Sequence, residues 1–134
     1  MLAAELNSAE QSPTPLLRLS QDDLESLVEG CDLLIVPVSP DIMGIKGSID
    51  TLELLEGMNS DLHRLLLTMV NPSRKTGIQA REALEDYPLF EGQIRRYAAY
   101  EKASLAGCLV QDSGDRYGRI AWSDYQKVGK EIIE

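Results

Sequence analysis

The sequence is poor in cysteine and histidine, and this scarcity argues against two kinds of site. Among 134 residues there are two cysteines, Cys31 and Cys108, and a single histidine, His63. Zinc is normally held by several Cys and His side chains at close spacings, and the two cysteines lie far apart in the chain. We therefore expect no zinc site and no disulfide, with both thiols buried as small apolar side chains.

Basic residues and long apolar runs are also scarce. The chain has 13 Lys and Arg against 22 Asp and Glu, a net charge of −9. Such a surface repels nucleic acid and anionic lipid, so DNA contact would require a local basic patch. No stretch reaches the ~18 apolar residues of a membrane span, and the amino-terminus lacks a signal-peptide pattern. We expect a cytoplasmic protein that does not associate with membranes.

The densest apolar stretches predict two strands. Residues 33–36 (LLIV) are apolar without alternation and are followed by Pro37 and Pro40. This pattern is typical of a central strand of a parallel sheet, buried on both faces. A second run over 65–70 (LLLTMV) is closed by a polar turn, Asn71-Pro72-Ser73, and predicts a second buried strand.

Helical spacing of apolar residues surrounds these two runs. The predicted helices are one capped by Ser20 and ending at Gly30, one from Asp41 to about Gly57 with Ile42 on its apolar face, one from Thr76 to before Pro88 with Ile78 on its apolar face, one from Tyr97 to Leu105, and one from Ala121 to Ile133. A short strand is predicted over 89–94. Residues 1–15 are predicted to form a flexible arm, and residues 16–134 one α/β domain.

The order of these elements predicts the architecture. Strands that alternate with helices form right-handed βαβ units, and hence a parallel sheet covered by helices in a three-layer α/β domain. Ligands of such sheets bind beyond the carboxyl ends of the strands. We therefore expect a site near residues 37–41 and 71–75.

Several sequence blocks, taken in order, resemble the carboxyl-terminal half of ParA/MinD-type partition ATPases, which belong to the deviant Walker group of P-loop proteins. The blocks are DDL at 22–24, EGCDLLIVP at 29–37, LLTMVN at 66–71, IRR at 94–96, KASLAG at 102–107, DY at 124–125 and KEI at 130–132. The resemblance covers about residues 20–134. It implies the second half of a doubly wound P-loop NTPase fold, with a parallel sheet of three or four strands.

The phosphate-binding part of that family's site has no counterpart in this sequence. Complete members bind ATP and Mg²⁺ through a loop of the form Lys-Gly-Gly-x-Gly-Lys-[Ser/Thr], and the nearest cluster here, Gly44-Ile45-Lys46-Gly47, lies in a predicted helix. A metal-supporting aspartate is expected near Thr14 and is missing. The resemblance thus implies no catalytic residue and no cofactor held by this chain alone, and leaves enzymatic activity undecided.

Two groups of residues match positions that function in the family. Asn71 and Pro72 match the positions that contact the adenine edge, although Asn71 is also typical of a turn before proline. Arg95 and Arg96 match basic positions used for nonspecific DNA binding or for contacts in the nucleotide-dependent dimer, and Arg74, Lys75 and Lys102 could extend them into a stripe. A solvated charged face remains the alternative for this stripe.

Three functions stay open from the sequence. The first is a ParA-like partition protein, truncated and unable to hydrolyse ATP alone, which acts as a homodimer or beside a full-length ParA-like or ParB-like partner. The second is the carboxyl-terminal part of an active ATPase whose other half lies upstream or on another chain. The third is a stand-alone α/β interaction module. Loss of a first half would leave a sheet edge uncovered, so we expect a marginally stable, oligomeric or partner-dependent chain.

Overall fold

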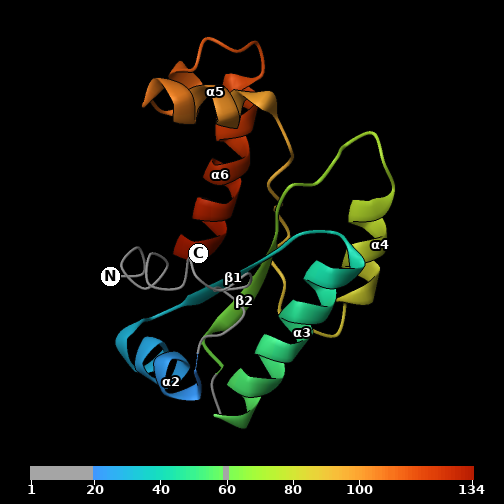
Figure 1. Cartoon of the computed structure of the whole chain (residues 1–134), viewed down its shortest axis with the longest axis vertical. Coiled ribbons are helices and arrows are strands. Elements are labelled where there is room, and N and C mark those ends of the chain that lie inside the picture. The colour runs from blue at the N-terminus through green and yellow to red at the C-terminus, as the bar shows by residue number, and fades with distance from the viewer. Residues whose placement is uncertain (1–19, 59–60) are drawn as a thin grey trace, which may run out of the picture.

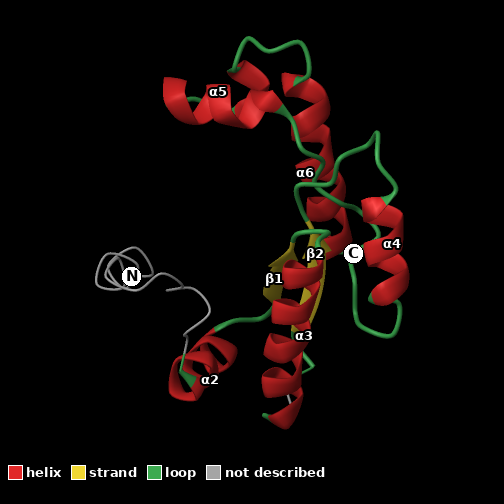
Figure 2. Cartoon of the chain, turned by 45° about the vertical axis from the view of Figure 1, so that its right-hand side comes forward, coloured by secondary structure: helices red, strands yellow, loops and turns green. Residues whose placement is uncertain are grey.

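The computed structural model describes residues 20–58 and 61–134. Its elements, in chain order, are α2 (Gln21–Gly30), β1 (Leu34–Val38), α3 (Ile42–Gly57), β2 (His63–Leu67), α4 (Thr76–Ala83), α5 (Ala98–Ala106), the 3₁₀-helix η3 (Val110–Asp112) and α6 (Gly118–Ile133) (Figures 1 and 2). The predicted arm over 1–15 and the position of Thr14 lie outside the described residues.

The sheet is parallel, as predicted, but smaller than expected. β1 pairs with β2 in a register that places Leu34 opposite His63 and Val38 opposite Leu67. The next extended segment forms two isolated parallel bridges, Leu89 with Leu65 of β2 and Arg95 with Val70 just after β2. Within the described part of the chain the sheet therefore has two strands plus an irregular third segment, and the prediction of three or four strands is wrong.

β1 is an edge strand among the described residues, which corrects the prediction of a central strand buried on both faces. Val38 is buried, whereas Ile35 is 37% exposed and Pro37 is exposed. One face of β1 packs on a core formed with α2, α3 and α4, while the opposite face of the sheet is covered by α6 only over β2. A run of apolar residues is compatible with an edge strand and with a central strand, so the composition of residues 33–36 could not distinguish between these two positions in the sheet.

The backbone of β1 shows which edge is unpaired. The Leu34 N–H donates to the Leu62 carbonyl and the Val38 carbonyl accepts from the Thr68 N–H, both at 2.9 Å. Because backbone groups alternate in direction along a strand, those of Ile35 and Pro37 point to the other edge. Proline there removes one donor from the edge, which is where sheets tolerate it.

The helix boundaries follow local capping chemistry. The Ser20 hydroxyl accepts from the Asp23 N–H at 3.1 Å while the Asp23 carboxylate accepts from the Ser20 N–H, which confirms the predicted cap. Asp41 caps α3 by accepting from the Gly44 N–H at 2.7 Å. Hydrogen bonds from Ser39 and Gly44 lower the pKa of Asp41. α5 ends at Gly107, whose φ of +66° is the left-handed geometry that glycine adopts readily.

Four apolar or thiol side chains are more exposed than predicted. Ile42 is 83% exposed at the first turn of α3, beyond the end of the sheet, and Ile78 is 64% exposed on α4. α4 buries Gly77, Ala80 and Leu84 instead, and Ile78 lies about 100° around the helix from that face. Cys31 is half-buried and Cys108 is exposed, so the expected burial of both thiols is also wrong.

The segment between α4 and α5 is held between β2 and α6. On one side, the N–H groups of Phe90 and Ile94 donate to carbonyls of β2 at 2.9 Å. On the other side, the Glu131 carboxylate accepts from the N–H groups of Glu91 and Gly92 at 2.7 and 2.8 Å. Asp124 of α6 accepts from the Arg95 N–H at 3.0 Å. The carboxylates of Asp124 and Glu131 thus accept backbone hydrogen bonds that the carbonyl groups of a further strand would accept in a larger sheet.

The two hydrogen bonds that the Glu131 carboxylate accepts provide a test of this arrangement. Glu131→Ala removes two hydrogen bonds to a charged acceptor, so it should lower the free energy of unfolding by about 2–3 kcal/mol. Urea unfolding followed by circular dichroism measures the loss. Glu134→Ala, at the exposed end of α6, is the matched control and should change stability little. Equal midpoints for the two variants would contradict a structural role for Glu131.

Candidate functional site

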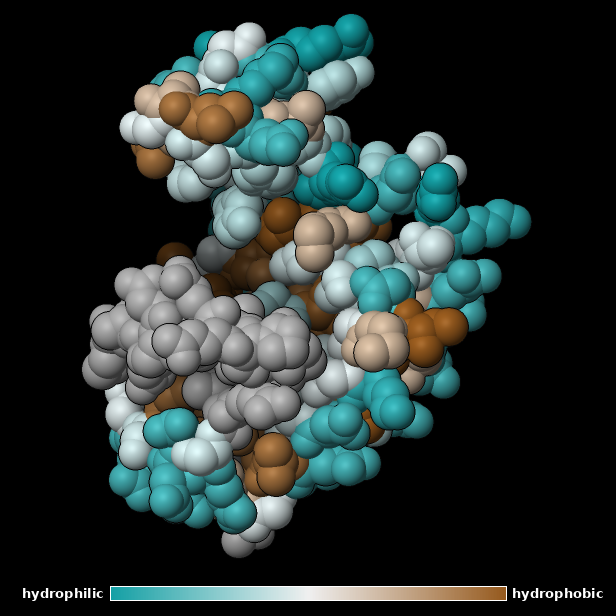
Figure 3. Space-filling view, viewed as in Figure 1, coloured by the Kyte–Doolittle hydropathy of each residue, from teal (hydrophilic) through white to brown (hydrophobic). Residues whose placement is uncertain are grey.

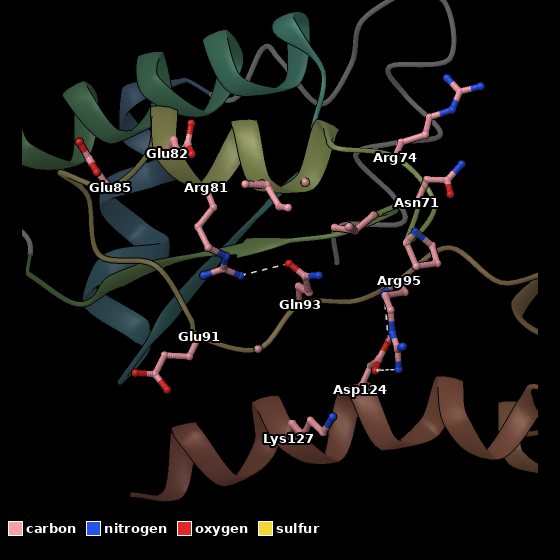
Figure 4. Close-up of a pocket in the computed structure, with 15 residues that line it drawn as sticks. Asn71, Arg74, Arg81, Glu82, Glu85, Glu91, Gln93, Arg95, Asp124 and Lys127 are labelled. Carbon is pink, nitrogen blue, oxygen red and sulfur yellow. Dashed lines mark hydrogen bonds and ion pairs between the residues drawn. The ribbon is translucent and has the colours of Figure 1, made fainter.

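A cleft of about 810 Å³ lies beyond the carboxyl end of β2, between α4, the segment that follows it, and α6 (Figure 4). Its lining residues are Val70, Asn71, Pro72, Arg74, Gly77, Ile78, Arg81, Glu82, Glu85, Glu91, Gly92, Gln93, Arg95, Asp124 and Lys127. Of the predicted site residues, it brings together Asn71, Pro72, Arg74 and Arg95. The predicted loop over 37–41 does not line it.

Asn71 forms the turn that its sequence context suggested. Its side-chain carbonyl accepts from both the N–H and the hydroxyl of Ser73, at 3.0 and 2.7 Å. These two bonds occupy both lone pairs of the carbonyl oxygen. The Asn71 amide nitrogen has no partner among the described residues and remains able to donate. In this conformation Asn71 offers a ligand a donor but no acceptor, which is half of what the edge of adenine requires.

Arg95 is fixed by a two-pronged ion pair. Its Nε and Nη2 donate to the two oxygens of Asp124 at 3.1 and 2.8 Å, and Asp124 is only 3% exposed. The hydrogen bond with Asp124 raises the pKa of the Arg95 guanidinium. The guanidinium also lies 5.4 Å from the ring of Tyr97. Arg95 therefore contributes little free positive charge to the cleft.

The other predicted basic residues are dispersed. Lys102 of α5 lies outside the cleft and pairs with Asp115 at 2.7 Å, and this lysine lowers the pKa of the Asp115 carboxyl. Arg74, Lys75 and Arg96 are exposed and make no ion pair with any residue that the structure describes. Only Arg74 among these three lines the cleft. Of the predicted basic residues, those without an ion pair among the described residues are therefore the two on the turn after β2 and Arg96.

The cleft contains residues to which the sequence assigned no site role. Arg81 of α4 donates to the Phe90 carbonyl at 3.0 Å and to the Gln93 side chain at 3.2 Å. Figure 4 shows Glu82, Glu85 and Glu91 at one end and Asn71 and Arg74 at the other, so the cleft is acidic at one end and basic at the other. No local pattern in the sequence marked Arg81 as a site residue. Asp124 lay in a matched block, but nothing local paired it with Arg95.

Two kinds of feature are absent from the described residues. No cluster of three or more His, Cys, Asp and Glu side chains that could hold a metal ion occurs in 20–58 or 61–134. No helix in these ranges is long and apolar enough to cross a membrane.

Met69, at the end of β2, has an unusual backbone conformation. Its φ is +53°, in the left-handed region, and its side chain is 59% exposed. The neighbouring Thr68 and Val70 are both tied into the sheet, because their N–H groups donate to the carbonyls of Val38 and Ile94. Strain of this kind persists only where the surroundings impose it. It lies two residues before Asn71, so it helps to set the path of the turn beside the cleft.

The fold and the cleft define an α/β protein with parallel strands and a candidate site at the carboxyl end of a strand. Over 112 residues the chain is 31% identical to "Maintenance of carboxysome distribution protein A" of Gloeobacter kilaueensis. The match covers 81% of this chain and 52% of that protein, so the chain spans about half the length of this curated relative. No protein-family model matches the chain.

Substitutions at Met69 test the strained turn. Left-handed backbone costs an L-residue about 1–2 kcal/mol, whereas glycine adopts it freely at a smaller entropic cost. Met69→Gly should therefore leave the free energy of unfolding unchanged or raise it by up to about 1 kcal/mol, and the β-branched Met69→Val should lower it. Thermal unfolding of both variants shows which of them is more stable. A Val variant as stable as the Gly variant would refute the strain at Met69.

Proposed function

We propose that this chain is a ParA-like protein of the partition and positioning class that does not bind or hydrolyse ATP by itself. The observation that carries the proposal is its 31% identity, over 81% of its length, to a protein named for maintaining carboxysome distribution. The ordered blocks of residues 22–132 support the same assignment. We place the chain in the cytoplasm, where such proteins act on intracellular cargo.

The sequence supports the loss of independent nucleotide binding. Phosphates are the stronger anchor of a nucleotide in P-loop proteins, and the chain lacks the glycine-rich lysine loop that cradles them. What the cleft offers is the base-binding side, with Asn71 and Pro72 as proposed contacts. Because the Asn71 carbonyl is engaged by Ser73, a base would meet only its amide donor. Such a contact by itself would be weak.

A second candidate is the carboxyl-terminal part of an active ATPase whose other half lies upstream or on another chain. Two observations favour it. The outward-facing backbone groups of Ile35 and Pro37 have no partner among the described residues, so a further strand could pair there. The chain also spans about half of its relative. The proposed partner is then a ParA-like chain that supplies the phosphate loop. A ParB-like adaptor is the corresponding partner for cargo.

Nucleotide binding tests the loss of independent ATP binding, and the DNA upstream of Met1 separates the two candidates. The purified chain alone should bind no ATP at millimolar nucleotide, measured by calorimetry, because it lacks a phosphate loop. Micromolar binding that is lost in Asn71→Ala would overturn this. Stimulation or inhibition of the ATPase activity of the Gloeobacter relative by added chain would support a partner role. A glycine-rich lysine loop in the translated DNA upstream of Met1 would favour the second candidate.

The exposed cations give a separate test of DNA contact. We propose nonspecific contact through Arg74, Lys75 and Arg96, with Arg95 and Lys102 restrained by their ion pairs. Each phosphate contact contributes about 0.9 to the slope of log affinity against log salt. Arg74→Ala with Arg96→Ala should therefore reduce the slope by about two, measured by DNA retention at several salt concentrations. The control is Lys130→Ala on α6, and equal slopes for all three proteins would exclude this surface.

A further inference from the structure

Four side chains from two parts of the chain form a column of arginine guanidinium groups and tyrosine rings. The Arg95 guanidinium lies 5.4 Å from the centre of the Tyr97 ring, and that ring stacks on Tyr117 at 5.6 Å. The Arg116 guanidinium in turn lies 4.7 Å from the centre of the Tyr117 ring. Guanidinium groups are attracted to the faces of aromatic rings. The column thus links Arg95 to Arg116, which is distant in the sequence, through two stacked rings.

The arginines in and beside this column differ in whether their charge is neutralised. Arg96 and Arg116 are exposed and make no ion pair with any residue that the structure describes. The Arg95 side chain is 29% exposed, and its Nε and Nη2 both donate to Asp124. Of these three arginines, Arg95 alone is therefore paired with an acid.

The acid that pairs with Arg95 belongs to another element, α6. Figure 4 shows the Asp124 and Arg95 side chains meeting between α6 and the segment that follows α4. Asp124 also accepts from the Arg95 N–H at 3.0 Å, a bond for which an uncharged acceptor would serve as well. A buried carboxylate is costly to desolvate. What the charge of Asp124 adds, beyond these hydrogen bonds, is the neutralisation of Arg95.

Few interactions hold α6 against the rest of the molecule. Val128 packs in a small apolar cluster with β2 and the segment after α4, and Glu131 accepts from two backbone N–H groups of that segment. Figure 3 shows the surface hollowed beneath α5, so α5 and the start of α6 stand away from the sheet on this face. Parts of a protein held by few buried contacts can open without global unfolding. Displacement of α6 would separate Asp124 from Arg95.

We propose that Asp124 is an autoinhibitory contact, which withholds Arg95 from the phosphates of DNA until α6 moves away from the segment that carries Arg95. With α6 in place, a phosphate would have to replace the carboxylate and would leave it buried without its partner, which is costly. With α6 displaced, Arg95 becomes available beside Arg96. The proposal rests on the DNA contact proposed above, and it adds Arg95 to that contact in the displaced state.

The reactivity of the Arg95 guanidinium tests the masking without DNA. Phenylglyoxal modifies free guanidinium groups, and tandem mass spectrometry compares the modification of Arg95 with that of the exposed Arg96. In the unmodified chain Arg95 should react several-fold more slowly than Arg96. In Asp124→Asn, which keeps the size of the side chain and removes its charge, the two rates should become similar. Equal rates in the unmodified chain would overturn the proposal.

The control for this measurement is Glu134→Gln, which makes the same change of net charge at the exposed end of α6. Arg95 should stay slow to react in this variant. A second variant, Glu131→Ala, leaves the pair of Arg95 and Asp124 intact but loosens α6, so it should also speed the modification of Arg95. This variant decides the matter if Asp124→Asn does not fold, as judged by circular dichroism. An unchanged rate in Glu131→Ala would overturn the displacement of α6.

The salt dependence of DNA retention measures the added contact. Asp124→Asn should steepen the slope of log affinity against log salt by about 0.9, the contribution of one phosphate contact. Glu134→Gln should leave the slope unchanged, and adding Arg95→Gln to Asp124→Asn should return it to that of the unmodified chain. DNA retention by Asp124→Asn with an unchanged slope would overturn the proposal. If no protein retains DNA while Asp124→Asn frees Arg95 for phenylglyoxal, the DNA contact is refuted and the masking of Arg95 is supported.

Discussion

The structure depends on the backbone of residues 88–96, which lies between β2 and α6. One edge of this segment bonds to β2 through Phe90 and Ile94, and the other bonds to carboxylates of α6. Asp124 and Glu131 are two helical turns apart, so both reach the segment from one side of α6, with the buried Val128 between them. Without these bonds, the two-stranded sheet would make few contacts with α5 and α6. We call the bonds of residues 88–96 to β2 and to α6 the clamp. The clamp fixes the position of α5 and α6 and, with it, the shape of the cleft.

The clamp also determines what the cleft can do. Arg95 and Arg81 look like ligand-binding cations from their position, but their guanidinium groups are occupied by Asp124, by Gln93 and by the Phe90 carbonyl. Burial of Asp124 makes its pair with Arg95 costly to break, because the lost partner would leave an uncompensated charge. The polar groups of the lining that stay available to a ligand include the Asn71 amide, Arg74 and Lys127.

Much of the fold could be predicted from local patterns. The cap at Ser20, the end of α5 at Gly107 and the two parallel strands follow from hydrogen bonding and apolar spacing within each element. The irregular segment over 89–94 was less predictable, since half of its partners are side chains of α6 that lie about 30–40 residues away in the chain. The sequence indicated the turn after β2, and it named four of the residues that line the candidate cleft, Asn71, Pro72, Arg74 and Arg95. It did not find Arg81, Gln93 or Asp124, because no local signal pairs them.

The sequence by itself determined most of the helices, the two parallel strands, the excess of acid in the first half, and the lack of a phosphate loop, because each depends on neighbouring residues or on composition. Only the tertiary structure decided that β1 is an edge strand, that Arg95 is neutralised, and that the Asn71 carbonyl is already engaged. It also decided that Ile42 and Met43 of α3 are exposed among the described residues. An apolar or charged residue has the same local pattern whether a distant element covers it or not, and only the packing of the chain determines which of the two occurs.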